Sequence, residues 1–130
     1  MKALIVEDDF TNRLLLQSFL SHYGECHIAA NGKEAVEAYQ AAAQQNQRYD
    51  LICMDILMPE MDGRDAIRVI RHMEANASIY GGGAKIFMTS ALDDVKEIVR
   101  AFRGLCDAYL VKPIDTRKLL DELKGHNLVQ

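Results

Sequence analysis

The sequence predicts a single α/β domain, in which a parallel β-sheet of five strands carries helices on both of its faces. Five short apolar runs alternate with five stretches in which apolar residues recur every three or four positions. Four of the runs are apolar throughout, which is typical of strands buried on both faces. A length of 130 residues fits one such domain and leaves no room for a second.

The predicted strands are short and evenly spread along the chain. The continuous apolar runs are Ala3–Val6, Leu51–Met54, Ile86–Met88 and Ala108–Val111. A weaker run, Cys26–Ala30, suits an edge or half-covered position in the sheet. Because helical stretches connect the strands, the strands are expected to be parallel and joined by right-handed crossovers.

Each helical stretch has one apolar face that can pack on the sheet. The apolar positions are Leu15, Leu16, Phe19, Leu20 and Tyr23; Ala35, Val36, Tyr39 and Ala42; Ala66, Ile67, Ile70 and Met73; Val95, Ile98, Val99 and Phe102; and Leu119, Leu120 and Leu123. Boundary residues agree with this division. Gly24 and Gly32 follow turns, Asp93 or Asp94 can cap the fourth helix, and Asp115 or Thr116 can cap the fifth.

Composition excludes several classes of protein. The 15 Lys and Arg residues against 19 Asp and Glu residues give a net charge of −4, with no basic block that would bind nucleic acid or an anionic membrane. The first apolar run is too short for a signal peptide or a membrane span. Cys26, Cys53 and Cys106 are odd in number and form no CxxC pair, which favours reduced thiols. We therefore expect a cytoplasmic protein with no direct nucleic-acid or membrane partner.

Polar side chains follow four of the predicted strands. They are Glu7, Asp8 and Asp9 after the first strand, Asp55 after the third, Thr89 and Ser90 after the fourth, and Lys112 after the fifth. In open parallel sheets the ligand site lies beyond the carboxyl ends of the strands. Taken singly, each of these residues is as typical of a solvated turn as of a ligand site. Their coincidence at four strand ends is what predicts a site.

These residue types fit a site that holds a phosphoryl group. Two carboxylates about 4 Å apart repel by roughly 4 kcal/mol at an effective dielectric constant near 20, so the acids are expected to bind a cation or to raise a pKa. Oxygen ligands without nearby His or Cys favour Mg²⁺. Lys112 would add a positive charge and Thr89 or Ser90 a hydroxyl donor, and Asp55 could act as the nucleophile.

Four motifs together resemble the receiver domains of two-component response regulators over nearly the whole chain. They are Leu4–Asp9 with Arg13 downstream, Met54–Gly63, Met88–Ala91 and Tyr109–Pro113. The resemblance implies a flavodoxin-like doubly wound (βα)5 sandwich with strand order 2-1-3-4-5 and helices on both faces. It also implies a signalling protein that is not an enzyme, except in catalysing its own phosphorylation and dephosphorylation.

The resemblance assigns roles to individual residues. Asp55 would be the phosphoacceptor, and Lys112 and Thr89 would contact the phosphoryl oxygens. Mg²⁺ or Mn²⁺ would be held by Asp8, Asp55 and the backbone carbonyl of Leu57, with Glu7 acting through water. Three consecutive acids leave the register open. Glu7 and Asp8 are favoured because they directly follow the strand and Arg13 then lies five positions after Asp8, with Asp9 as the alternative.

The resemblance further implies a switch and two kinds of partner. Tyr109 would move inward together with Thr89. A sensor histidine kinase or a histidine phosphotransfer protein would donate the phosphoryl group, and an unknown protein target would bind the face formed by the fourth helix, the fifth strand and the fifth helix. The charged residues of that face are Lys96, Arg100, Arg103, Arg117 and Lys118. The resemblance is also compatible with a homodimer.

Other features set limits on this interpretation. The stretch 76–83 is longer than the usual connection in the family, and its glycines match no P-loop. Leu57 and Ala91 occupy positions that tune the lifetime of the phosphoryl group in the family. We expect a receiver domain at residues 1–125, a short tail at 126–130 and no output domain. The alternatives are a flavodoxin-like cofactor binder, an aspartyl-phosphate phosphatase and a receiver cut from a longer protein.

Overall fold

A computed structural model describes residues 1–56, 61–76, 83–91, 100, 102 and 104–130. Its elements, in chain order, are β1 (Lys2–Val6), α1 (Phe10–Leu20), β2 (Glu25–Ala29), α2 (Gly32–Gln44), β3 (Leu51–Asp55), α3 (Gly63–Asn76), β4 (Lys85–Ser90), β5 (Ala108–Val111) and α5 (Thr116–Gly125). Most of the predicted fourth helix falls on residues 92–99, 101 and 103, outside the described part of the chain, so the label α4 is not used.

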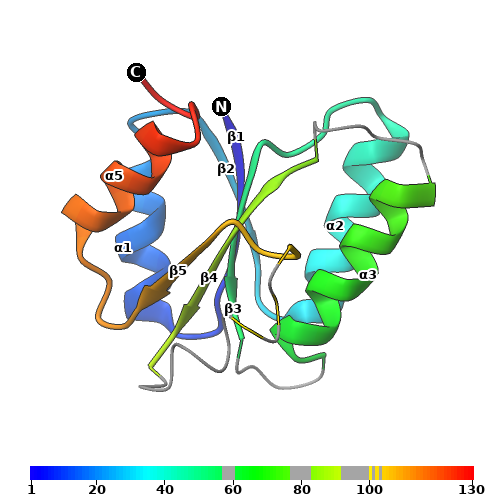
Figure 1. Ribbon diagram of the computed structural model, residues 1–130, viewed down its shortest axis with the longest axis horizontal. Coiled ribbons are helices and arrows are strands. Elements are labelled where there is room, and N and C mark those ends of the chain that lie inside the picture. Colours follow the sequence, from blue (N-terminus) through cyan, green and yellow to red (C-terminus); the bar gives the residue numbers. More distant parts are fainter. Residues whose placement is uncertain (57–60, 77–82, 92–99, 101, 103) are drawn as a thin grey trace.

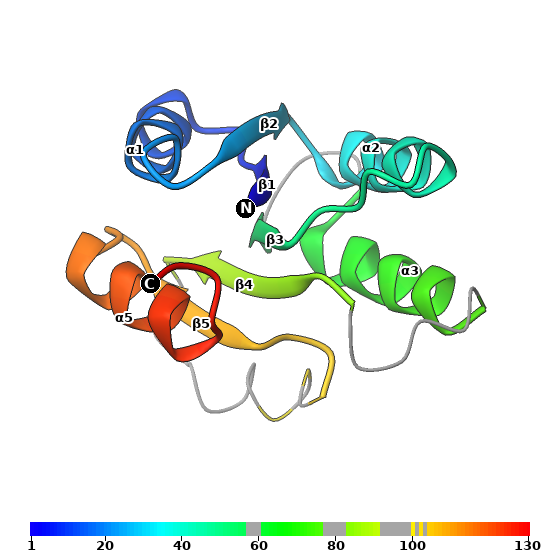
Figure 2. The same ribbon diagram turned by 90° about the horizontal axis from the view of Figure 1, so that it is seen from above.

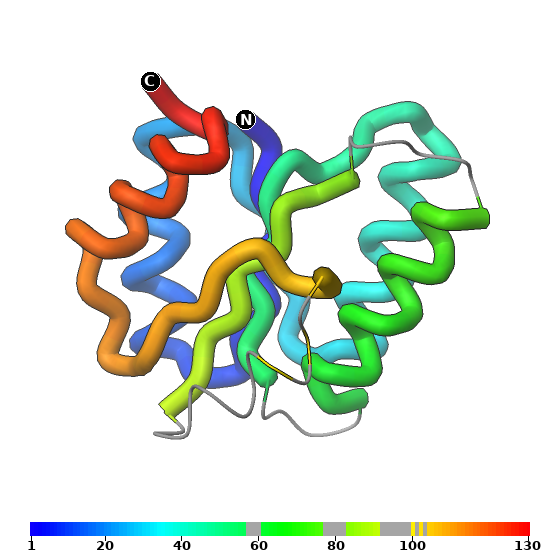
Figure 3. Tube along the Cα trace, in the orientation of Figure 1, coloured from blue at the N-terminus to red at the C-terminus, as the bar shows by residue number. Residues whose placement is uncertain are grey.

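The five strands form one parallel sheet in the order β2-β1-β3-β4-β5. Helices α1 and α5 cover one face of the sheet, and α2 and α3 cover the other (Figures 1 and 2). The parallel sheet with helices on both faces and the weaker second strand at an edge agree with the sequence pattern, and the strand order is that of the flavodoxin-like sandwich implied by the resemblance. The two termini lie together at the end of the molecule opposite the carboxyl ends of the strands (Figure 3).

Side chains on the two faces of the sheet form two apolar cores. The core under α2 and α3 is lined by alternate strand residues such as Leu4, Ile52 and Ile86. The core under α1 and α5 uses the intervening residues, among them Ile5 and Phe87. All five side chains are fully buried, which accounts for the continuous apolar runs of the central strands.

Capping side chains fix where the helices begin. Asp9 caps α1 by accepting the backbone N–H of Asn12 at 2.9 Å. Asn31 caps α2 in the same way. Asp115 caps α5, which decides between the two candidates that the sequence offers for that helix.

Several strands differ by one residue from the sequence prediction: β1 begins at Lys2, β2 spans Glu25–Ala29 in place of Cys26–Ala30, and β3 includes Asp55. The larger differences are at the ends of α1 and β4. Helix α1 ends at Leu20, and Tyr23 belongs to the following turn, where its N–H donates to the carbonyl of Leu20. Strand β4 continues past its apolar run through Thr89 and Ser90, because these residues still pair with β3 and β5. Both residues are buried, and the longer strand carries Thr89 to the position beside Asp55.

A buried polar network supports the end of the sheet opposite the strand ends that carry the acids. Glu74 of α3 accepts hydrogen bonds from Arg71, from the hydroxyl of Tyr39 on α2 and from the backbone N–H of Ala84. Arg71 also contacts Asp107, just before β5, at 3.0 Å. The network therefore ties α2 and α3 to the amino ends of β4 and β5.

Candidate functional site

The polar residues that follow the strands meet at one edge of the sheet. Asp55 is the last residue of β3 and pairs directly with Thr89 of β4. Glu7 and Asp8 follow β1, the neighbour of β3 on its other side, and Lys112 follows β5. The parallel topology brings these five residues to a common rim because all four strands end there.

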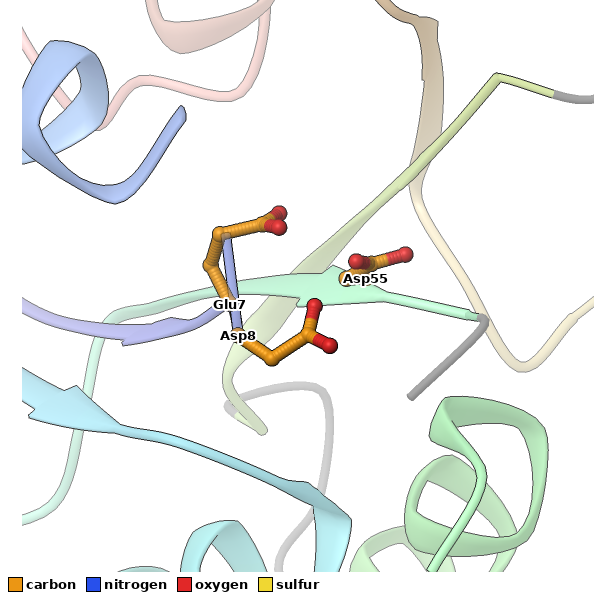
Figure 4. A group of neighbouring side chains, drawn as sticks. All are labelled: Glu7, Asp8 and Asp55. Atoms are coloured by element: carbon orange, nitrogen blue, oxygen red, sulfur yellow. The ribbon is translucent and has the colours of Figure 1, made fainter. Parts of the chain in front are cut away.

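Three carboxyl groups converge at this rim. Glu7, Asp8 and Asp55 each offer one carboxylate oxygen, and these oxygens lie within 4.8 Å of one another. Figure 4 shows Glu7 and Asp8 extending from the end of β1 toward Asp55. Glu7 and Asp55 are buried, with 0% and 4% of their surface exposed, whereas Asp8 is exposed. The cluster is thus anchored in the protein and open to solvent on the Asp8 side.

The structure separates the three consecutive acids by role. Asp9 turns its carboxylate to the first turn of α1, where it serves as the cap described above. Its own backbone N–H donates to Glu7 Oε1 at 3.1 Å, which orients the Glu7 side chain. Among the described residues it is therefore Glu7, and not Asp9, that joins Asp8 and Asp55 in the cluster.

Lys112 supplies the positive charge at the centre of the site. Its Nζ donates to Asp55 Oδ2 at 2.9 Å and to Glu7 Oε1 at 3.0 Å. The side chain is only 14% exposed, so both ion pairs are shielded from bulk water. Glu7 and Lys112 lie 105 positions apart in sequence, and no local pattern indicates that they pair.

The positive charge of Lys112 does not fully offset the negative charge of the three carboxylates. Burial, together with the charge of Asp55, raises the pKa of Glu7 from 4.5 to about 7, against the lowering effect of Lys112. Burial alone would lower the pKa of Lys112, but its hydrogen bonds to Glu7 and Asp55 raise it, so this amine stays protonated. With all four groups ionised, the rim carries three negative charges and one positive charge, which favours binding of a cation.

Thr89 and Tyr109, the two residues with predicted switch roles, lie beside the site. The hydroxyl of Thr89 is buried and finds no hydrogen-bond partner among the described residues. Tyr109 is half-buried, packs against the core under α2 and α3, and pairs with Met88 in the β4–β5 ladder. Leu57, the residue whose backbone carbonyl the resemblance makes a metal ligand, lies outside the described residues.

The surface next to the site contains a groove. A cavity of about 280 Å³ is lined by residues of β5 and the start of α5: Tyr109, Leu110, Val111, Lys112, Pro113, Asp115 and Lys118. Arg100, Arg117 and Lys118 are exposed, as expected for the predicted partner face, whereas Lys96 and Arg103 fall outside the described residues. Lys112 thus belongs both to the acidic site and to the wall of this groove.

Comparison with known proteins identifies the family. The profile of the response regulator receiver domain matches residues 3–124. The chain belongs to this family. As a receiver domain it is a component of two-component signalling. It is 32% identical over 124 residues to the chemotaxis protein CheY of Thermotoga maritima, covering 94% of this chain and 93% of that protein. Some other relatives are far longer, and the chain spans only 7% of a hybrid histidine kinase of Dictyostelium discoideum.

Solved structures of receiver domains share the fold along almost the whole chain. The response regulator TrrA of Thermotoga maritima, solved in complex with Mg²⁺ and BeF, is 27% identical with a TM-score of 0.76, and the match covers 96% of this chain and 97% of that one. The receiver domain of Ssk1 of Saccharomyces cerevisiae, solved with the histidine phosphotransfer protein Ypd1, is 28% identical with a TM-score of 0.79, covering 98% and 89%. No helix among the described residues is long and apolar enough to span a membrane.

Proposed function

We propose that this receiver domain accepts a phosphoryl group from a phosphohistidine on Asp55, with Mg²⁺ bound beside it, and thereby changes its affinity for a protein target. The observation that carries the proposal is the 2.9 Å contact between Lys112 Nζ and Asp55 Oδ2 within a cluster of three carboxylates. An ammonium group and a cation site on either side of one buried carboxylate suit the transfer of a phosphoryl group to that carboxylate.

The donor set around Asp55 fits a hard divalent cation. The three carboxylates provide oxygen ligands, and the carboxylates of Glu7 and Asp55 are buried, with Lys112 Nζ as the cation that contacts both. We assign Asp8, Asp55 and the backbone carbonyl of Leu57 as direct ligands, with Glu7 acting through water. Mg²⁺ is favoured and Mn²⁺ is the substitute, because both prefer oxygen ligands. When bound, the ion neutralises negative charge on the phosphoryl oxygens.

The transfer uses the groups that the fold holds in place. An oxygen of Asp55 attacks phosphorus and forms a P–O bond, the P–N bond of the donor phosphohistidine breaks, and the imidazole leaves after taking up a proton from solvent. Lys112, which stays protonated, exchanges a carboxylate contact for a phosphoryl oxygen. The unpartnered hydroxyl of Thr89 donates to another phosphoryl oxygen.

Movement of Thr89 gives the modified site a way to affect the surface. The acyl phosphate changes the charge on Asp55 from −1 to about −1.5 to −2 and adds three acceptor oxygens. As Thr89 moves toward these oxygens, Tyr109 fills the space behind it and the groove along β5 changes shape. The protein target binds the face that contains this groove and the exposed Arg117 and Lys118.

The identity of the partners follows from the same chemistry. The donor is a sensor histidine kinase or a histidine phosphotransfer protein, and the solved complex of a similar receiver domain with Ypd1 supports the second kind. A stand-alone domain at residues 1–125, a tail at 126–130, a homodimer and a cytoplasmic location remain predictions. In the structure, Leu128 and Val129 of the tail pack against the core under α1 and α5.

The proposal is tested with acetyl phosphate as a small phosphodonor. Intact-mass spectrometry of the wild-type protein should show an adduct of about 80 Da, the mass of a phosphoryl group, that needs Mg²⁺ and is labile in base. Asp55→Asn should abolish the adduct, and Asp121→Asn, a change at an exposed acid of α5, should leave it intact. An adduct that persists in Asp55→Asn would reject Asp55 as the phosphoacceptor.

A further inference from the structure

The start of α2 contacts Met61, just before the start of α3. Gly32, the first residue of α2, donates its backbone N–H to the carbonyl oxygen of Met61 at 3.1 Å. A Cβ atom at Gly32 would lie closer than 3.0 Å to that oxygen and 3.1 Å from the Cβ of Met61. Because side chains essentially never approach backbone so closely, only glycine lets the two backbones meet here.

Two residues later, the backbone of Gly63 lies close to the backbone of Asp55. A Cβ atom at Gly63 would lie closer than 3.0 Å to the carbonyl oxygen of Asp55 and 2.8 Å from the Cα of Ile56. Between the two contacts, Asp62 accepts the backbone N–H of Arg64 at 2.7 Å. Residues 61–63 therefore lie between the start of α2 and the backbone of Asp55, with a close backbone approach at Gly32 and another at Gly63.

We propose that Gly32 is a positioning residue for divalent-cation binding, an inference that rests on the function proposed above. Gly32 touches neither the cation nor the phosphoryl group. A methyl group at this position has to push Met61 away, and the displacement passes through Gly63 to the backbone of Asp55. Because Mg²⁺ demands near-ideal octahedral geometry, a small shift of Asp55 relative to Asp8 weakens binding.

The proposal is tested with Gly32→Ala. Gly125→Ala is the matched control, since it adds the same methyl group at a helical glycine with nothing within 4 Å. Titration of the purified protein with Mg²⁺ alone, followed by calorimetry, should show a dissociation constant about tenfold higher in Gly32→Ala, as for residues that orient metal ligands. Gly125→Ala should bind like wild type.

A second measurement separates positioning from a general loss of stability. In Gly32→Ala, the Mg²⁺ concentration that gives half the maximal phosphorylation rate from acetyl phosphate should rise by the same factor, whereas the rate at saturating Mg²⁺ should match wild type. A reduced free energy of unfolding with an unchanged Mg²⁺ dissociation constant would overturn the proposal. If Gly32→Ala does not fold, Met61→Gly is the alternative variant, because it adds no atom and gives the backbone that contacts Gly32 more conformational freedom. Met61→Gly should weaken Mg²⁺ binding. Wild-type affinity in this variant would overturn the proposal.

The controls also distinguish this proposal from the proposed function. If the wild-type protein neither binds Mg²⁺ nor takes up a phosphoryl group, the function assigned to the site is wrong. If the wild-type protein does both and Gly32→Ala binds Mg²⁺ equally well, only the role of Gly32 is wrong.

Discussion

Burial of Glu7 should make the metal-free protein less stable as the pH rises. Its pKa is raised from 4.5 to about 7, chiefly by burial. The folded protein therefore holds a proton on Glu7 at pH values where the unfolded chain has lost it. Unfolding releases that proton, so the stabilisation is fully present below pH 4.5 and is lost as the pH rises to 7 and beyond.

The size of the effect follows from the shift in pKa. A rise in the pKa of Glu7 from 4.5 to about 7 corresponds to at most about 3 kcal/mol. Between pH 5 and pH 8, titration of this one group should lower the free energy of unfolding by about 2 to 3 kcal/mol. Glu7→Gln keeps the size of the side chain and removes the titration. The pH dependence of the difference between wild type and this variant therefore isolates Glu7.

Urea denaturation in EDTA, followed by circular dichroism at pH 5 and pH 8, measures this difference. Relative to Glu7→Gln, the wild-type protein should lose about 2 to 3 kcal/mol more of its free energy of unfolding over this range. Glu37→Gln, a change at an exposed position of α2, should behave like wild type. Equal pH dependence of wild type and Glu7→Gln would refute the reasoning, because it would mean that Lys112 alone neutralises the buried carboxylate.

Three further predictions concern single residues. Thr89→Val should leave the free energy of unfolding within about 1 kcal/mol of wild type, because the Thr89 hydroxyl has no hydrogen-bond partner among the described residues. The same variant should abolish the phosphorylation-dependent NMR shift of Tyr109, and a retained shift would contradict the switch. Arg71→Met should lower the free energy of unfolding by about 3 kcal/mol in urea denaturation, because buried Glu74 loses its ion-pair partner. Its Mg²⁺ affinity should stay unchanged, and a variant as stable as wild type would contradict the role of the network. Asp8→Asn should weaken Mg²⁺ binding in calorimetry by about tenfold or more, and unchanged affinity would remove Asp8 from the ligands.

The sequence predicts the sheet well because its central strands are buried on both faces. Leu51 to Met54 is apolar at every position, and no solvated helix would tolerate that pattern. The limits of the elements are less predictable. Tyr23 continues the helical spacing of α1, yet the chain turns after Leu20. Thr89 is polar, but pairing with both neighbouring strands keeps it in β4.

The candidate site is predictable to the extent that it depends on strand ends. Because parallel strands end at the same rim, the position of Asp55 after one strand and of Glu7 after another is enough to predict that they meet. The contact between Glu7 and Lys112 depends on tertiary structure and has no local signal. The contact between Gly32 and Met61 has no local signal in the sequence either, since a glycine beside a helix start is equally typical of an ordinary turn.

Chemical mapping of the phosphoryl group tests the central claim most directly. Wild-type protein phosphorylated with acetyl phosphate and Mg²⁺ is reduced with borohydride, which converts an aspartyl phosphate to homoserine, and is then digested and sequenced by mass spectrometry. The account predicts homoserine at position 55 alone, and none when EDTA replaces Mg²⁺. Homoserine at another acid of the rim, or equal labelling without Mg²⁺, would contradict it.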